Sequence, residues 1–112
     1  IPRCPYCGES LTMNLRCDDA FVEDSGWHQA ARRYEDFVHR HRGTHLLLLE
    51  LGVGFNTPGI IKYPFWKMTA QNPQAVYACV NVGPSYCPPQ IQQQSLCLHE
   101  DLGRVLGDLL AG

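Results

Sequence analysis

The chain has no excess of basic residues, no long apolar run and no leader-like segment at its start. Its formal net charge is -2, which argues against a nucleic-acid partner, because such proteins usually carry a basic stripe. No apolar stretch approaches the roughly 20 residues that a membrane-crossing helix needs, so we expect no membrane partner. From the first residues we expect no signal peptide. At 112 residues the chain has room for one domain.

The six cysteines lack the spacing of a disulfide framework, since just Cys4 and Cys7 lie close together. Cys17, Cys79 and Cys97 lie in apolar or strand-like segments, where a free thiol acts as a small hydrophobic group. We therefore expect a reducing, cytoplasmic location. The chain also lacks an initiator methionine and reaches a cysteine motif by its fourth residue. That abrupt start predicts a part of a longer protein.

The turn from Cys4 to Gly8 (CPYCG) has the spacing of a zinc knuckle. Two thiolates two residues apart can bind one metal ion, and the glycine allows the backbone to turn tightly. A structural zinc needs four ligands, and the chain contains no second Cys-x-x-Cys. We therefore predict that residues 1–11 form half of a structural zinc site, with the other ligands upstream. A redox pair or a disulfide is the alternative, although nothing strand-like precedes Cys4.

The segment from His45 to Trp66 (HLLLLELGVGFNTPGIIKYPFW) reads as a buried strand followed by a glycine-rich turn and a helix. Its leucines leave no polar face, which is typical of a parallel strand covered on both sides. Gly52 and Gly54 follow at once, where a tight turn needs conformational freedom. Thr57-Pro58 predicts an N-cap followed by proline at the first helical position. Free amides at such a helix start can bind phosphate or ribose, so we predict a nucleotide site.

Strand-like and helix-like segments alternate along the chain. This alternation predicts an α/β fold with a parallel sheet and helices on both faces. The expected elements are a short strand within 13–22, a helix from Asp24 or Ser25 to Gly43, a strand over 46–51, a helix over about 58–71, a strand over 75–82, a loop over 83–90, a strand over 95–98 and a helix over 102–110, with Glu100 and Asp101 in its first turn.

Several segments resemble the second half of sirtuins, and most closely the microbial sirtuins linked to macrodomain proteins. These segments are CPYCG at 4–8, MNLR at 13–16, DD at 18–19, FVED at 21–24, GWH at 26–28, ELGVGFNTP at 50–58 and IIKYPFW at 60–66. The resemblance implies that residues 12–112 form the C-terminal part of a Rossmann-like NAD-binding domain. Residues 1–11 would belong to a small zinc-ribbon lobe.

The resemblance implies an NAD-dependent enzyme that releases nicotinamide and passes ADP-ribose to a removed acyl group or to a protein. The macrodomain-linked branch is associated with protein ADP-ribosylation and lipoylated carrier proteins, so the expected substrate is an acylated protein. The family's catalytic histidine segment and first phosphate-binding loop lie upstream of the zinc pair. The resemblance therefore places no catalytic residue in this chain. The missing N-terminal part of the same protein would complete the enzyme, and the 112 residues alone should be inactive.

Eight residues would line the NAD site by their position in the family's motifs. They are Gly52, Val53, Gly54, Asn56, Thr57, Asn81, Leu98 and His99. The first three and Asn81 would contact the adenosine ribose, and the last two would lie near the adenine. The family has Thr-Ser where this chain has Val53-Gly54, which removes a hydroxyl contact. Backbone amides, or Asn56 and Thr57, would have to replace that contact.

Phe21, Val22 and Glu23 would face the acyl or protein substrate by the same resemblance. Val22 stands where the family has glycine, which would narrow the substrate channel. Lys62 and Lys67 could neutralise phosphates, but we expect them on a solvated helix face. An alternative function remains for the whole chain: a non-catalytic zinc-knuckle interaction module in which the glycine turn is merely structural.

Overall fold

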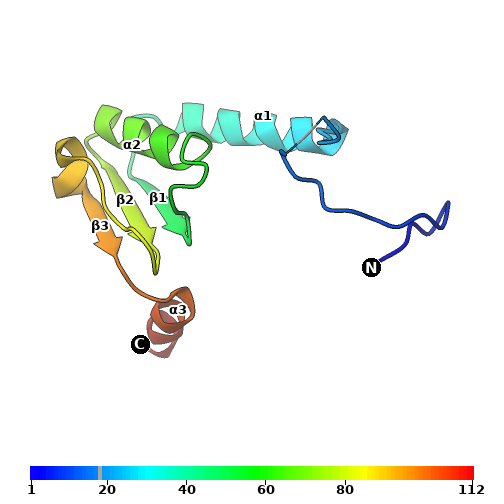
Figure 1. Cartoon of the computed structure of the whole chain (residues 1–112). Coiled ribbons are helices and arrows are strands. Elements are labelled where there is room, and N and C mark those ends of the chain that lie inside the picture. Colours follow the sequence, from blue (N-terminus) through cyan, green and yellow to red (C-terminus); the bar gives the residue numbers. More distant parts are fainter. Residues whose placement is uncertain (18) are drawn as a thin grey trace. The chain divides into compact units, whose positions relative to one another are not determined.

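A computed structural model of the chain describes residues 1–17 and 19–112 (Figure 1). Asp18, which belongs to one of the sirtuin-like segments, lies outside the described residues. The chain divides into two compact units, Ile1–Phe37 and Val38–Gly112. The elements are α1 (Ser25–Arg40), β1 (Leu46–Leu51), α2 (Lys62–Gln71), β2 (Ala75–Val80), the 3-10 helix η1 (Pro89–Gln94), β3 (Ser95–Leu98) and α3 (Leu102–Ala111).

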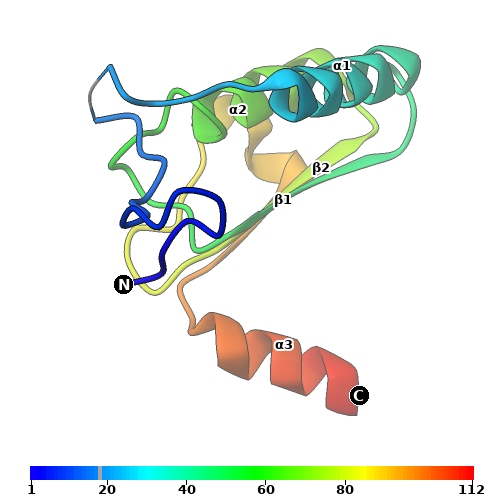
Figure 2. The same cartoon turned by 90° about the vertical axis from the view of Figure 1, so that its right-hand side faces the viewer.

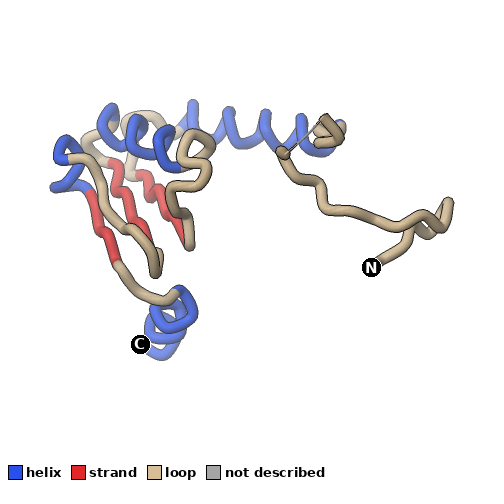
Figure 3. Tube along the Cα trace, viewed as in Figure 1, coloured by secondary structure: helices blue, strands red, loops and turns tan. Residues whose placement is uncertain are grey.

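The second unit contains a parallel sheet of three strands in the order β1-β2-β3 (Figure 3). Leu46 pairs with Ala75 at the start of β1, and Val80 pairs with Leu98 at the end of β3. The predicted strands at 46–51 and 95–98 are confirmed. The middle strand was predicted to end at position 82 but ends at Val80. After Val80 the chain leaves the sheet toward the proline-rich loop.

Helix α2 covers one face of this sheet (Figure 1). Side chains at alternate strand positions point toward it, because successive residues of a strand face opposite sides. Phe65, Trp66 and Met68 of α2 pack against the buried cluster beneath them. The buried members of that cluster are Leu48, Ala75, Tyr77, Cys79 and Ile91.

The other face of the sheet is apolar and largely exposed, although Ala78 and Val80 of β2 are buried on it. Strand β1 is thus covered on one side, so the prediction of a strand covered on both sides is wrong. Helix α3 lies on that side (Figure 2), but it leaves its own apolar residues, such as Leu109 and Leu110, exposed. A helix therefore lies on each side of the sheet. Of these two helices, α2 packs on the strands, together with the 3-10 helix η1. We call this surface the open face, and its exposed residues are Leu47, Leu49, Leu51, Val76 and Leu96.

Helix α2 begins four residues later than the sequence predicts. Its N-cap is Ile61, and no side chain caps it, so the prediction of a Thr57 cap is wrong. The Thr57 carbonyl accepts a hydrogen bond from the Ile60 amide at 3.5 Å, and the Pro58 carbonyl accepts one from Tyr63 at 2.9 Å. A Pro-Gly pair favours such a turn over a helical start.

Helix α1 begins as predicted, because the Asp24 carboxylate accepts a hydrogen bond from the Trp27 amide at 2.8 Å. The strand predicted within 13–22 is wrong, since no described residue there is in a strand. The Asn14 side chain forms hydrogen bonds with both the N–H and the C=O of Val22. A side chain therefore makes the hydrogen bonds that a neighbouring strand would otherwise make. Among the helices of the described residues, none has the length and apolar composition needed to cross a membrane.

Candidate functional site

The chain turns sharply where β1 ends. Gly52 has a φ of 71°, in the left-handed region that side chains disfavour. Its amide donates to the Val80 carbonyl at 2.8 Å, which ties the exit of β1 to the end of β2. A Cβ at this position would lie 3.2 Å from the Leu102 side chain. The backbone angle therefore favours glycine, and a side chain here would also have to displace the Leu102 side chain of α3 slightly.

A cavity of about 310 Å³ lies in the loop that follows this turn. Two glycines contribute to its wall, so part of that wall is bare backbone. Its volume is at the lower end of the range of about 300–1,000 Å³ that small-molecule sites occupy. We call it the glycine-loop cavity, and its lining residues are Gly52, Val53, Gly54, Asn56, Thr57, Ile60 and Ile61.

Five of the eight residues predicted for the NAD site thus line one cavity. Asn81 lies beside it, because a Cβ at Gly54 would be 3.8 Å from the Asn81 amide nitrogen. That amide donates to the Pro84 carbonyl at 3.1 Å. Leu98 and His99 lie at the same edge of the sheet but outside the lining. Nδ1 of His99 lies 2.7 Å from the Gly83 carbonyl.

The cavity occupies the carboxyl end of a parallel sheet. In open α/β sheets this is the end at which ligands bind. The loops after β1 and β2 meet here, because the Asn81 side chain faces Gly54. The backbone N–H of Asn81 donates to the Leu98 carbonyl at 3.1 Å, which ties the loop after β2 to the end of β3. The wall of the cavity combines the bare backbone of two glycines, the polar side chains of Asn56 and Thr57, and the apolar side chains of Val53, Ile60 and Ile61. Polar groups of this kind can bond the hydroxyl groups of a sugar.

A buried polar cluster lies beneath this loop, and the sequence patterns described above do not predict it. Nζ of Lys62 lies 2.6 Å from a carboxylate oxygen of Glu50, and both side chains are fully buried. The same ammonium group donates to the Tyr77 hydroxyl at 3.2 Å and to Cys79 Sγ at 3.7 Å. The expected solvated position of Lys62 is therefore wrong, whereas Lys67 is exposed.

A signal for this cluster exists in the sequence. Glu50 lies an even number of residues from Leu46 and Leu48, so it shares their face of the strand. A carboxylate at an inward position needs a buried cation, and Lys62 is the first lysine after it. Burial, and next the neighbouring Glu50 carboxylate, raise the pKa of Tyr77, so its hydroxyl stays protonated and can donate.

The cysteine turn folds tightly within the first unit. Arg3 and Ser10 form an isolated antiparallel bridge, and the Gly8 amide donates to the Cys4 carbonyl at 2.9 Å. Backbone amides of Cys7 and Tyr6 lower the pKa of the Cys4 thiol, which favours the thiolate that a metal requires. Within residues 1–17 and 19–112, no three histidine, cysteine or acidic side chains form a metal-binding group. The turn therefore offers two ligands of the four that structural zinc needs.

The predicted substrate residues also lie in the first unit. Glu23 forms an ion pair with Arg16 at 2.9 Å, and the Arg16 guanidinium lies 4.1 Å from the Phe21 ring centroid. The Val22 side chain is exposed, and this residue helps to line a cavity of about 510 Å³ that also includes Met13. Arg16 thus holds Phe21 and Glu23 together within this unit.

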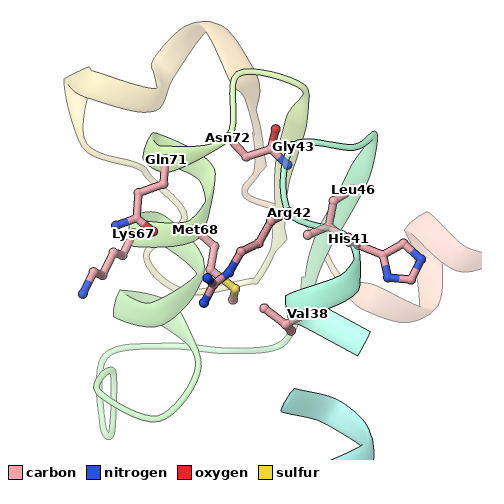
Figure 4. A pocket seen from close by; sticks show the side chains of 9 residues that line it. All are labelled: Val38, His41, Arg42, Gly43, Leu46, Lys67, Met68, Gln71 and Asn72. Carbon is pink, nitrogen blue, oxygen red and sulfur yellow. The ribbon is translucent and has the colours of Figure 1, made fainter. Parts of the chain in front are cut away.

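A second cavity in the Val38–Gly112 unit, of about 410 Å³, lies at the opposite end of β1 (Figure 4). Its wall combines apolar side chains such as Met68 with cationic ones such as Arg42. His41 lines it too, but its ring points away from the other labelled side chains in Figure 4. None of the predicted NAD-site residues is among its lining residues. Because it lies at the amino ends of the strands, it is the weaker candidate for a nucleotide.

Comparison with known proteins adds two relatives, whereas no family model matches the chain. Over 107 residues it is 36% identical to a Staphylococcus aureus protein named "Protein ADP-ribosyltransferase". Over 116 residues it is 28% identical to a Fusarium oxysporum f. sp. cubense protein named "Probable bifunctional ADP-ribose hydrolase/ADP-ribosyltransferase". These alignments cover 95% and 98% of this chain, but 34% and 19% of the two relatives. The chain thus spans about a third or less of the relatives it matches.

Proposed function

We propose that this chain is the nucleotide-binding portion of a longer, sirtuin-like enzyme that transfers ADP-ribose from NAD to a protein. The main support is the glycine-loop cavity at the carboxyl end of a parallel sheet, in a chain similar over 95% of its length to a protein named ADP-ribosyltransferase. In a more specific form of this proposal, the ADP-ribose passes to an acyl group that is removed from the substrate protein, as in deacylating sirtuins.

Gly52, Val53 and Gly54 would hold the adenosine ribose against backbone, since they line the cavity directly after β1. Asn56 and Thr57 line the same cavity and would supply the polar contacts that Val53 and Gly54 cannot. Bound NAD would supply the ADP-ribosyl group and release nicotinamide. The residues of this chain would bind and orient the adenosine half, while the catalytic groups would lie elsewhere in the protein.

Cys4 and Cys7 would hold one half of a structural zinc site. The amides that favour the Cys4 thiolate support this role, and the remainder of the longer protein would supply two further ligands. With four protein ligands the metal would have no open position, so it would stabilise the fold rather than take part in the chemistry.

The remainder of the protein would also cover the open face. Parallel sheets occur almost always with both faces covered, and here the exposed face is formed by leucine and valine. The relatives are about three times as long as this chain or longer. They therefore contain enough additional sequence to provide a second layer.

The test is NAD binding by the complete protein, with two matched glycine variants measured by calorimetry. Gly54→Val places a side chain in the wall of the glycine-loop cavity, whereas Gly59 lies in the same loop outside the lining and a Cβ there meets no atom within 4 Å. We expect NAD binding to weaken about 10-fold or more for Gly54→Val, the equivalent of losing one good contact. Gly59→Val should bind like the unmodified protein.

A complete protein that shows no NAD binding at millimolar concentration would overturn the proposal and favour the interaction-module alternative. Equal weakening by both glycine variants would remove the cavity from the site. ADP-ribose is a useful second ligand, because it carries the same adenosine half and lacks nicotinamide.

A further inference from the structure

Glu50 and Lys62 lie at the two ends of the loop that forms the glycine-loop cavity. Glu50 is two residues before Gly52, and Lys62 directly follows Ile61, the last lining residue. Their side chains meet at 2.6 Å although 12 positions separate them in the sequence. The ion pair therefore closes the base of the loop.

Stability alone does not explain why this pair is buried. Removing two charges from water is costly, and replacing a buried ion pair by apolar residues of similar size is often neutral or stabilising. One oxygen of Glu50 and the indole N–H of Trp66 are buried without a hydrogen-bond partner in the described part of the chain, so the cluster is not fully satisfied. We therefore attribute the burial of this ion pair to the geometry that it imposes on the loop above it.

The pair also joins the loop to its neighbour through Phe55. Nζ of Lys62 lies 5.1 Å from the Phe55 ring centroid, which is within the range of a cation–π contact. The Phe55 ring stacks on Tyr86 with centroids 5.0 Å apart and an angle of 17°. Phe55 belongs to the loop after β1 and Tyr86 to the loop after β2. Fixing Lys62 therefore fixes the relative position of both loops at the cavity.

We propose that Glu50 and Lys62 are positioning residues, whose buried ion pair holds the 52–61 loop in the shape that accepts the sugar of the nucleotide. This inference rests on the proposed function for the identity of the ligand. The shape of the loop, however, can be measured without any ligand. A loop already held in its binding shape loses less conformational entropy when the ligand binds.

The experiment uses the complete protein with the double variant Glu50→Leu/Lys62→Met, which replaces the ion pair by apolar side chains of similar size. The matched control is Thr69→Val, because Thr69 is a fully buried polar residue of the same helix whose hydroxyl bonds to Phe65. Amide hydrogen exchange is measured without NAD, and NAD affinity by calorimetry. The melting temperature reports whether each variant keeps its overall stability.

We expect the amides of 52–57 to exchange about 10-fold faster in the double variant, while those of β2 keep their protection. NAD binding should weaken about 5- to 20-fold, because the loop must then be ordered on binding. Thr69→Val should leave both measurements unchanged. A merely structural pair would instead alter protection throughout the sheet, in proportion to the change in melting temperature.

Unchanged exchange at 52–57 together with unchanged NAD affinity in a folded double variant would overturn the inference and leave the proposed function standing. If the unmodified protein does not bind NAD, the proposed function fails, and the exchange measurement alone decides the positioning role. If the double variant does not fold, Glu50→Gln/Lys62→Met replaces it, because it also removes both charges and keeps a polar side chain of the same size at position 50. Unchanged exchange at 52–57 in that variant would then contradict the inference.

Discussion

The two faces of the three-stranded sheet carry side chains of opposite character. The face covered by α2 includes a carboxylate, a tyrosine and a cysteine, Glu50, Tyr77 and Cys79, all buried. The open face is aliphatic, and most of it is exposed, with Leu47 60% accessible. A globular domain usually keeps charged groups out of its core and covers its apolar faces, so each face departs from the usual arrangement in one respect.

Each of these two departures has its own explanation. An aliphatic face more exposed than a monomeric protein usually tolerates indicates a surface that another layer covers, and the proposed longer protein supplies one. The ion pair buried beneath α2 is not explained by stability, and in our proposal it fixes the position of the loop above it. In our proposals, therefore, the open face is an interface with the rest of the longer protein, and the covered face determines the shape of the glycine-loop cavity.

We expect the largest loss of stability when one partner of the Glu50–Lys62 ion pair is removed. Lys62→Met leaves the Glu50 carboxylate buried without its cation, so we expect the free energy of unfolding to fall by about 3–5 kcal/mol. The double variant Glu50→Leu/Lys62→Met should recover to within about 1 kcal/mol of the unmodified protein. Urea unfolding of the complete protein measures both. A single variant as stable as the unmodified protein would show that the pair is not a buried ion pair in solution.

We expect a somewhat smaller loss of stability when a leucine of the open face is truncated. If the remainder of the longer protein covers it, Leu49→Ala removes a buried leucine and should cost about 2–4 kcal/mol in the complete protein. An exposed leucine would cost less than about 0.5 kcal/mol. The same urea unfolding measurement distinguishes the two. The smaller cost would indicate that the open face stays exposed and that the covering layer does not exist.

The smallest effect concerns the pH dependence of the covered face. Burial, with the neighbouring Cys87 thiol as the next cause, raises the pKa of Cys97 from 9.0 to about 11. The folded state therefore keeps the proton more tightly than the unfolded state, and this contribution to stability is complete below pH 9.0 and is lost as the pH rises to about 11. Cys97→Val should flatten the decline in unfolding free energy over that interval.

Urea unfolding at several pH values between 8 and about 11 checks this prediction. The control is Cys17→Val, because Cys17 is exposed in the first unit. An identical decline in the unmodified protein and in Cys97→Val would contradict the assignment of this pH dependence to Cys97.

Local patterns predicted most elements of the Val38–Gly112 unit. The leucine run gave β1 with its correct ends, and the periodicity of the last segment gave α3. Asp101 is the N-cap of α3 and accepts a hydrogen bond from the Arg104 amide, so the prediction that Glu100 and Asp101 lie in the first turn is wrong. The start of α2 was misplaced, because Thr57-Pro58 satisfies the rules for a helix start while Pro58-Gly59 equally favours a turn. Sequence rules of this kind cannot decide between two local solutions of similar energy.

The candidate site was predictable where its residues are neighbours in sequence. Gly52, Gly54 and Asn56 follow one strand, so a single turn brings them together. Lys62 was misassigned, because its helix position suggested solvent and its burial depends on Glu50 and Tyr77 across the fold. His99 was expected near the adenine, and its hydrogen bond to Gly83 depends on how two loops meet.

Local sequence patterns were enough to show that an apolar strand ends in a glycine turn at the carboxyl edge of an α/β fold, because alternation and glycine freedom are properties of neighbouring residues. They could not show that Glu50 and Lys62 meet beneath that turn, or that one face of the strand stays exposed rather than buried. Such contacts join residues that are distant along the chain. Their energies depend on desolvation and packing, which exist only once the strands and helices have assembled.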